Sequence, residues 1–256
     1  MKILAIIPAR MDSTRFPGKP LALIQGVPMI GHIYKRTVMC DDLTDTYVAT
    51  CDQVIMDYIE SIGGKAVMTK NTHERCTDRC SEALLKIEEM NKTKYDCVVI
   101  IQGDEPLVTP TMISTAVNVF KTKNSDVVNL MKEIEFDEDY TDANEVKVVC
   151  NAANEAMYFS REAIPSQKKS KAKVKSYKQV AIMPFKREFL FKFSELTPTP
   201  LEIIESVDML RVLEHGLKVH MAEIKEPIFS VDTPADLEWV DSVMQKDKLF
   251  NAYKNR

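Results

Sequence analysis

Residues 3–8 read Ile-Leu-Ala-Ile-Ile-Pro, and residues 9–20 continue with Ala-Arg-Met-Asp-Ser-Thr-Arg-Phe-Pro-Gly-Lys-Pro. The apolar run is typical of a buried strand. The stretch that follows combines three cations, two hydroxyls and a Pro-Gly turn. Ligands of open α/β sheets bind beyond the carboxyl ends of the strands, and Arg and Lys donors suit phosphate groups. The segment therefore predicts a core strand and a polyphosphate-binding loop, with a solvated surface loop as the alternative.

The composition is that of an ordinary soluble protein: among 256 residues, 45% are hydrophobic and 28% are charged, with a net charge of −4. This balance argues against a nucleic-acid binder, which usually carries a basic excess. No apolar stretch is long enough to cross a membrane, and the N-terminus lacks the pattern of a signal peptide. We expect a cytoplasmic protein with no membrane insertion and no nucleic-acid partner.

The six cysteines favour reduced thiols. Cys97 and Cys150 lie in apolar runs and are expected in the core. His73, Cys76 and Cys80 suggest a zinc site, but they contain no Cys-x-x-Cys pair and no second pair completes four ligands.

The first half of the chain alternates short apolar runs with amphipathic stretches. This pattern predicts an α/β fold with a largely parallel sheet and helices on both faces. Strands are expected at 3–7, 46–49, 66–68 and 97–101, and helices at 28–39, 52–62, 77–90 and 111–122.

The second half is less regular and predicts a mixed sheet or a hairpin arm. Strands are expected at 127–133, 146–151, 156–160, 180–185 and 217–222, and a helix at 201–215. The lysine-rich run 168–175 is interpreted as an exposed mobile loop, which could also cover the site as a lid.

The start of the last helix is marked by three residues. Thr233 can cap it, Pro234 stands at the favoured first position, and Asp236 follows three residues after the cap. This arrangement places Asp232 at the end of a strand expected over 228–231.

Two aspartates are candidate magnesium ligands. Asp104 follows the apolar run 97–101, and Gly103 before it permits a close backbone approach. Asp232 also follows an expected strand. Magnesium is usually held by one or two carboxylates together with phosphates. The alternatives are an exposed turn acid for Asp104 and a helix cap for Asp232.

Several motifs occur in one order along nearly the whole chain, and together they resemble the 3-deoxy-manno-octulosonate (Kdo) cytidylyltransferases. They are residues 7–10, 13–21, 48–50, 63–64, 77–79, 102–106, 158–161 and 231–234. The resemblance implies a Rossmann-like nucleotide-diphospho-sugar transferase fold, mostly parallel, with a smaller mixed-sheet or dimerisation region. It also implies one nucleotidyltransferase domain, in which 1–125 mainly binds nucleotide, 126–225 mainly binds sugar and makes dimer contacts, and 226–256 carries a metal ligand and the C-terminal helix.

The resemblance also assigns roles to residues. Asp104 and Asp232 would bind the catalytic Mg²⁺, and Lys19 would act as a cation on the leaving group. The nucleotide would contact Ala9, Arg10, Ser13, Lys19, Arg79 and Gln102, and the sugar acid would contact Arg79, Gln102, Gln179 and Asp208. For Arg79 the alternative is a surface ion pair with Asp78 or Glu82. Arg15 is as readily a supporting residue as a ligand, and no residue stands out as an essential base.

The sequence departs from the family pattern mainly on the sugar side. Arg75-Cys76 replaces Ser-Gly, Cys51 replaces Asp, Gln179 and Met183 replace His and Tyr, and Asp208-Met209 replaces Glu-Gln. Because polar pairing carries much of a site's selectivity, we hypothesise a preserved reaction and an altered sugar acid.

The expected reaction is transfer of CMP from CTP to the anomeric hydroxyl of Kdo or a close relative, with release of pyrophosphate, by a homodimer. The alternatives are a sialic-acid-type or other sugar nucleotidyltransferase, and an inactive nucleotide-binding homologue. A dehydrogenase or P-loop enzyme is disfavoured, since the seven glycines form no Gly-x-Gly-x-x-Gly motif and the chain has no Walker P-loop.

Overall fold

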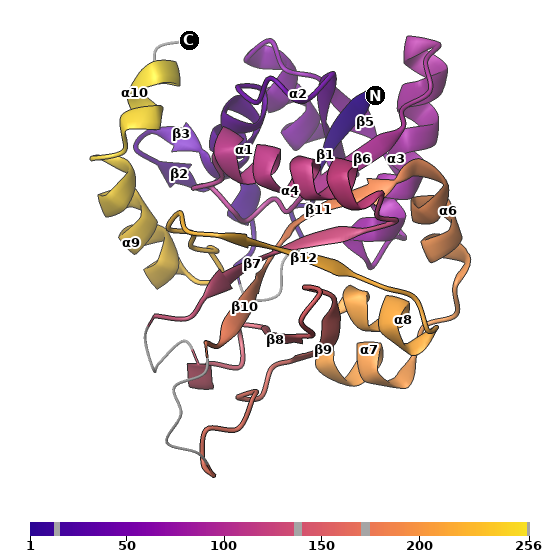
Figure 1. The fold of residues 1–256 in the computed structure, drawn as a ribbon. Coiled ribbons are helices and arrows are strands. Elements are labelled where there is room, and N and C mark those ends of the chain that lie inside the picture. The colour runs from indigo at the N-terminus through magenta and orange to yellow at the C-terminus, as the bar shows by residue number, and fades with distance from the viewer. Residues whose placement is uncertain (13–15, 136–139, 170–174, 255–256) are drawn as a thin grey trace. The chain divides into compact units, whose positions relative to one another are not determined.

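The computed structural model describes residues 1–12, 16–135, 140–169 and 175–254 (Figure 1). The chain divides into two compact units, Met1–Ser114 with Pro227–Arg256, and Thr115–Glu226. The boundary between them falls inside α4 (Pro110–Lys123). That the whole chain acts as one nucleotidyltransferase domain stays a prediction.

Four parallel strands of the first unit pair in the order β6-β1-β4-β5. Their bounds are Ile3–Ala9 (β1), Asp45–Thr50 (β4), Ala66–Met68 (β5) and Cys97–Ile101 (β6). The helices between them are α1 (Met29–Thr37), α2 (Gln53–Ser61) and α3 (Cys76–Asn91). Every residue of β1 and β6 is buried, which confirms the apolar runs as core strands of a parallel α/β sheet.

The strand order has a functional consequence. β1 lies inside this sheet, with β4 and β5 on one side of it and β6 on the other. The connections after β1 and β6 therefore run in opposite directions. Such a switch point leaves a crevice at the carboxyl ends of the two strands, where ligands of doubly wound sheets bind.

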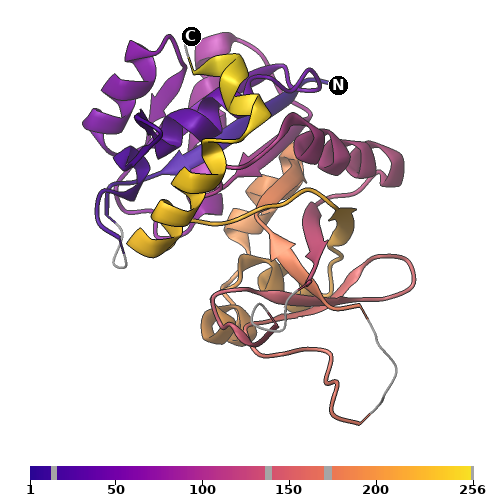
Figure 2. The same cartoon turned by 90° about the vertical axis from the view of Figure 1, so that its left-hand side faces the viewer.

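A short hairpin and the C-terminal helices complete the first unit. The 3₁₀ turn η1 (Lys19–Leu21) leads into β2 (Leu23–Ile24) and β3 (Val27–Pro28), which were not expected from the sequence. Beside this hairpin lies α9 (Pro234–Met244), followed by α10 (Lys248–Tyr253), as both ribbon views show (Figures 1 and 2).

The predicted start of α9 is confirmed. Thr233 accepts a hydrogen bond from the N–H of Asp236, and the Asp236 carboxylate accepts one from the N–H of Thr233, which is a complete capping box. The strand expected over 228–231 is wrong, since these residues form no strand. Apolar Ile228 and Val231 are buried there without a strand ladder.

A buried polar cluster joins α1 to the C-terminal helices. Arg36, which is fully buried, donates from Nε to the Tyr253 hydroxyl (2.9 Å) and from Nη2 to Asp247 Oδ2 (2.5 Å). His32 contacts the same hydroxyl through Nδ1 (2.7 Å) and the Ile24 carbonyl through Nε2 (2.8 Å). Burial and, to a smaller extent, the nearby Arg36 charge lower the pKa of His32 to about 4, so His32 is neutral at pH 7.

The second unit contains a mixed sheet in the order β12-β7-β10-β8-β9, as expected. Its strands are Val128–Glu133 (β7), Lys147–Cys150 (β8), Ala156–Ser160 (β9), Tyr177–Val180 (β10) and His220–Ile224 (β12). Only β12–β7 is parallel among these pairs of described strands. The strand expected over 180–185 is confirmed as β11 (Ile182–Lys186), which leads into α6 (Arg187–Glu195), but Val180 belongs to β10, since Ala181 interrupts the strand.

The single helix expected over 201–215 is also wrong. It divides into α7 (Pro200–Glu205) and α8 (Asp208–Glu214), with Ser206 in the left-handed region at φ 54°. Arg211 donates to both carboxylate oxygens of buried Glu202, at 2.7 and 2.6 Å. Residues nine apart in a continuous helix are separated by about 13 Å along its axis. The pairing of these two side chains therefore requires the break.

Two further sequence expectations concern membrane insertion and the lysine-rich run. No described helix has both the length and the apolar character needed to span a membrane. The lysine-rich run at 168–175 lies partly outside the described residues, since 170–174 are not among them.

We predict that Asp247→Asn destabilises the fold in a pH-dependent way. Burial raises the pKa of Asp247, but the hydrogen bond and charge of Arg36 outweigh it and hold that pKa below its usual value. The carboxylate therefore stabilises the fold above its unfolded-state pKa, and this contribution is lost as the pH falls through the lower folded-state pKa. The expected loss near pH 7 is about 3 kcal/mol, measured by urea unfolding from pH 7 down to pH 3.

The Asn side chain can still cap α10, so a loss that shrinks with falling pH reports the ion pair rather than the cap. Asp57→Asn, in an exposed pair with Gln53, is the control and is expected to change little at any pH. An equal loss at pH 7 and pH 3 for Asp247→Asn would contradict the assignment.

Candidate active site

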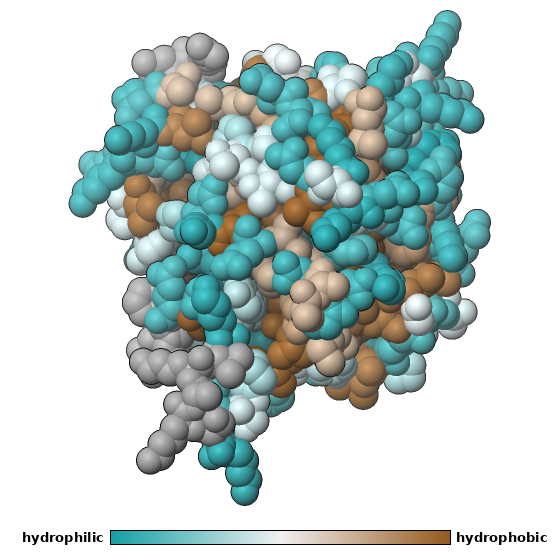
Figure 3. Space-filling model, viewed as in Figure 1, coloured by the Kyte–Doolittle hydropathy of each residue, from teal (hydrophilic) through white to brown (hydrophobic). Residues whose placement is uncertain are grey.

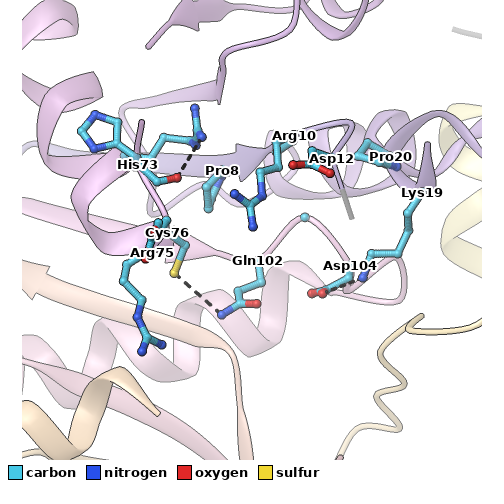
Figure 4. Close-up of a pocket in the computed structure, with 14 residues that line it drawn as sticks. Pro8, Arg10, Asp12, Lys19, Pro20, His73, Arg75, Cys76, Gln102 and Asp104 are labelled. Carbon is cyan, nitrogen blue, oxygen red and sulfur yellow. Dashed lines mark hydrogen bonds and ion pairs between the residues drawn. The ribbon is translucent and has the colours of Figure 1, made fainter. Parts of the chain in front are cut away.

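A cavity of about 320 Å³ lies in the first unit at the switch point of the sheet (Figure 4). Three segments line it: the residues after β1, the residues before and at the start of α3, and the residues after β6. The lining residues are Pro8, Ala9, Arg10, Asp12, Lys19, Pro20, His73, Glu74, Arg75, Cys76, Arg79, Gln102, Gly103 and Asp104. The structure thus brings together the two loops that the sequence singled out.

Lys19 lies at the centre of the charged groups. Its Nζ donates to Asp104 Oδ2 at 3.0 Å, to the Val231 carbonyl at 2.8 Å and to Asp232 Oδ1 at 3.4 Å. The Lys19 side chain is 12% exposed, and the two carboxylates are 24% and 22% exposed. One ammonium group therefore holds two carboxylates from distant parts of the chain, and of these Asp104 lines the cavity whereas Asp232 does not.

The backbone around Asp104 is tightly packed. A Cβ atom at Gly103 would lie 2.6 Å from the Pro8 carbonyl oxygen, closer than any real contact allows. A glycine is required there because the ends of β1 and β6 approach each other closely. Asp104 is fixed further by its carbonyl, which accepts the N–H of Val231 at 2.9 Å.

The loop after β1 places Ala9 and Arg10 at the cavity. Ala9 is the last, buried residue of the strand, and the exposed Arg10 points its guanidinium into the cavity in Figure 4. Ser13, the other expected phosphate contact, lies outside the described residues.

Asp52 is a supporting residue that the sequence interpretation missed. Its Oδ2 accepts the N–H of Met11 at 2.8 Å and the thiol of Cys51 at 3.6 Å. Although Cys51 stands where the family pattern has Asp, the next residue supplies a carboxylate that holds the loop after β1. An acidic residue two positions after Thr50, the last residue of β4, was the available signal.

Arg79 is a buried positioning residue in this structure rather than a surface one. It is 3% exposed, and it donates to Thr69 Oγ1 (2.6 Å), the Lys70 carbonyl (3.2 Å) and the His73 carbonyl (3.5 Å). The surface ion pair with Asp78 or Glu82 is therefore wrong for the described chain. Arg79 instead shapes the wall of the cavity formed by residues 69–73.

A second contact set braces the same wall. Glu82 accepts from Lys86 (2.7 Å), from the Lys70 N–H (3.2 Å) and from His73. Partial burial raises the pKa of Glu82, but these hydrogen bonds outweigh it and lower the pKa to about 2. Glu82 is therefore a carboxylate at neutral pH.

Gln102 and Cys76 face each other across the cavity (Figure 4). Gln102 Nε2 lies 3.9 Å from the Sγ atom of Cys76, which is the first residue of α3. Among the described residues, no three His, Cys, Asp or Glu side chains cluster as a metal site would require. His73, Cys76 and Cys80 therefore do not come together, and Cys80 is buried in the core.

The expected sugar contacts Gln179 and Asp208 belong to the second unit. Gln179, in β10, donates through Nε2 to Asn129 Oδ1 at 2.5 Å. Asp208 is the first residue of α8. Met183 and Met209, two of the departures from the family pattern, are 3% and 0% exposed and form part of the core.

The carboxylate pair fits a divalent cation. Asp104 and Asp232 already converge on one cationic group, the Lys19 ammonium, and supply the hard oxygen ligands that Mg²⁺ prefers. Two carboxylates are enough for a Mg²⁺ that completes its shell with water and phosphate oxygens.

A doubly wound sheet with cations and paired carboxylates at its switch point defines an α/β enzyme of the nucleotidyltransferase class. Comparison with known proteins agrees. Residues 4–222 match the family described as Cytidylyltransferase. The chain is 39% identical over 251 residues to the 3-deoxy-manno-octulosonate cytidylyltransferase of Geotalea daltonii, covering 94% of this chain and 97% of the relative. It is 40% identical over 247 residues to that of Parabacteroides distasonis, covering 93% and 96%.

Solved structures give the same result. A CMP:2-keto-3-deoxy-manno-octonic acid synthetase complexed with CTP matches with a TM-score of 0.87 and 35% identity, covering 96% of this chain and 99% of that one. A cytidylyltransferase from Leptospira borgpetersenii, 17% identical over 96% of this chain and 88% of that one, shares the fold with a TM-score of 0.63. The chain belongs to the 3-deoxy-manno-octulosonate cytidylyltransferase family.

We predict that Arg79→Met loosens the cavity wall. The substitution leaves the buried Thr69 hydroxyl and the part-buried carbonyls of Lys70 and His73 without this donor, at a cost of about 2–3 kcal/mol. It is expected to speed amide hydrogen exchange over residues 69–76. Urea unfolding and exchange mass spectrometry measure the two effects.

Lys65→Met is the matched control. Lys65 Nζ donates to Asp45 Oδ1 at 2.6 Å, but its side chain is 53% exposed and takes no part in the contacts of the wall. Its loss is expected to cost less than about 1 kcal/mol and to leave exchange over 69–76 unchanged. Equal effects of the two substitutions would show that Arg79 has no special role in the wall.

Proposed function

We propose that this enzyme transfers CMP from CTP to the anomeric hydroxyl of Kdo or a closely related 3-deoxy-2-ulosonic acid. In this reaction the anomeric oxygen forms a bond to the α-phosphorus, the bond from that phosphorus to the bridging oxygen breaks, and pyrophosphate leaves. The hydroxyl proton passes to solvent. The observation that carries the proposal is the joint contact of Lys19, which lines the cavity, with Asp104 and Asp232.

The chain supplies binding and charge. Arg10 presents a guanidinium that can bind phosphate oxygens in a bidentate manner. Lys19 is placed to neutralise negative charge on the leaving pyrophosphate, with Ala9 and Ser13 as further contacts of the triphosphate. Arg79 and Gln102 line the cavity where the base and the sugar carboxylate are expected.

Asp104 and Asp232 would hold the Mg²⁺ that this proposal includes. A bound Mg²⁺ supplies charge neutralisation at the transferring phosphoryl group. The two aspartates orient that charge because each is fixed, Asp104 by the tight β1–β6 approach and Asp232 by the start of α9.

A changed sugar acid is a second candidate, favoured by one observation. Met183 and Met209 replace polar family residues and are buried, so they offer no hydrogen bonds to a sugar hydroxyl. The acceptors to compare are Kdo, amino-Kdo, a nine-carbon ulosonic acid and a sialic acid, with a blank that contains no sugar.

We predict Mg²⁺-dependent pyrophosphate release from CTP with Kdo or with one relative. Asp104→Asn and Asp232→Asn are expected to lower kcat about 10²–10³-fold, because each removes charge stabilisation at the reacting phosphate. Asp57→Asn, on the exposed face of α2, is the control. If neither Kdo nor any relative gives turnover above the no-sugar blank while CTP binding is measurable, the inactive-homologue alternative is supported.

The proposal includes a homodimer in the cytoplasm. None of the six cysteines, each a described residue, forms a disulfide, which is typical of a reducing compartment. The second unit exposes apolar side chains on β9 and α7, namely Met157 (63%), Ile203 (61%) and Ile204 (78%). Hydrophobic surface gathers over α7 in Figure 3. Exposed apolar groups of this kind are typical of a subunit contact.

We predict that Ile204→Glu weakens the dimer, since a charge would have to be buried in the contact. Light scattering over a concentration series measures the molar mass. Leu85→Glu, at an exposed position of α3 in the first unit, is the control and should leave the mass unchanged. A wild-type protein that stays monomeric at every concentration would contradict the dimer.

A further inference from the structure

Asp232 lies on a segment without a strand to hold it. Among the described contacts of that segment, the Val231 N–H donates to the Asp104 carbonyl (2.9 Å) and Lys19 Nζ donates to the Val231 carbonyl (2.8 Å). These bonds fix residue 231, but the direction of the chain beyond it depends on α9.

Asp232 is bonded to the first turn of α9. The Asp236 carboxylate accepts both the N–H of Asp232 (2.9 Å) and the N–H of Thr233 (2.7 Å). Asp232 and the helix start therefore move together. Whatever positions α9 also positions the Asp232 carboxylate.

A three-bond tether positions α9. The Gln25 N–H donates to Asp241 Oδ1 (2.6 Å), and Gln25 Nε2 donates to Asp241 Oδ2 (2.6 Å) and to the Asp241 carbonyl (3.0 Å). Hydrogen bonds to a carboxylate are about twice as strong as neutral ones. Gln25 adopts φ 48°, the left-handed conformation of the tight β2–β3 turn, which aims both of its donors at one residue.

The same hairpin is connected to Lys19 by a short stretch of chain. Lys19 lies in η1, and the Ala22 carbonyl that follows accepts the N–H of Met29 at 2.8 Å, which closes the base of the hairpin. The tether thus joins the hairpin that follows Lys19 to the helix that follows Asp232. Figures 1 and 2 both show α9 alongside this hairpin.

We propose that Gln25 and Asp241 are positioning residues for the metal site, setting where the Asp232 carboxylate lies relative to Lys19 and Asp104. The inference rests on the proposed function, in which Asp232 holds the divalent cation. Outer residues that orient metal ligands typically change metal affinity by about 10–100-fold when they are removed.

The tether can be cut without releasing the C-terminal helices. Arg36 holds the far end of α9 and the start of α10 through Met244 Sδ (3.1 Å) and Asp247. Removing the Gln25 side chain therefore leaves the helices attached at Met244 and Asp247, while α9 loses two of the three bonds of the tether. This separates a positioning role from a general role in folding.

Three variants test the proposal. Gln25→Ala removes the two side-chain bonds, whereas Gln25→Lys offers an ammonium that can donate to the same carboxylate and carbonyl oxygens. Gln53→Ala is the matched control, because Gln53 Nε2 donates to Asp57 Oδ1 at 2.7 Å in an exposed Gln–Asp pair on α2.

The first measurement is amide hydrogen exchange over residues 228–236 in the ligand-free protein. The second is Mn²⁺ affinity in the presence of CTP, followed by electron paramagnetic resonance. Gln25→Ala should speed exchange in this segment and weaken Mn²⁺ binding about tenfold, with CTP affinity within about twofold of wild type. Gln25→Lys should restore both properties, and Gln53→Ala should change neither.

Each other result overturns the inference. Unchanged exchange in Gln25→Ala would show that the tether does not hold the segment. Faster exchange with unchanged Mn²⁺ affinity would show that it does not position Asp232. A wild-type protein that binds no Mn²⁺ with CTP would refute the proposed metal site itself, and the exchange data would still report on the tether.

Discussion

The contact of one ammonium group with two distant segments of the chain is the interaction on which the site depends. Lys19 reaches Asp104 across 85 residues and Asp232 across 213 residues. Two carboxylates within reach of one ammonium group would repel each other unless a cation lies between them. The lysine supplies that cation within the protein itself, so the acidic pair is assembled before any ligand binds.

The sheet topology explains why these residues can meet. Loops after β1 and β6 leave neighbouring parallel strands in opposite directions, and the glycine at 103 lets their backbones come close. A switch point supplies two of the lining segments of the cavity, those after β1 and β6, and the start of α3 supplies the third. The C-terminal segment adds Asp232, which Lys19 holds together with Asp104. The site therefore combines a feature built into the topology with one that depends on docking of a distant segment.

The sequence predicts the part of the fold that local pattern determines. Apolar runs gave the four parallel strands, and the Thr-Pro-x-Asp pattern gave the start of α9, because both signals are contained in a few neighbouring residues. The break at Ser206 could not be seen this way, since it depends on the Glu202–Arg211 pair and not on a Gly or Pro. The strand expected over 228–231 does not form either. A run of apolar residues indicates burial, but it does not specify a partner strand.

The candidate site shows the same division. The motifs named the residues that line the cavity, but not the contacts that hold them, such as Asp52 on the Met11 N–H or Arg79 on the loop carbonyls. These contacts join residues far apart in sequence, and their residue types alone are unremarkable. The polar character of Arg79 suggested a surface ion pair or a ligand, whereas its burial makes it part of the wall.

In the second unit, one contact fixes the orientation of Gln179, which is a departure from the family pattern. Asn129 is fully buried and donates both amide hydrogens, to the Leu130 carbonyl (2.8 Å) and the Val180 carbonyl (2.7 Å). Its oxygen must therefore accept, and this fixes Gln179 with its own nitrogen toward Asn129. If Gln179 faces the sugar, as the resemblance implies, its amide oxygen is the group turned away from Asn129. It would then select a substrate group that donates a hydrogen bond, because an amide held in this orientation cannot exchange its donor and acceptor ends as a histidine can by changing tautomer.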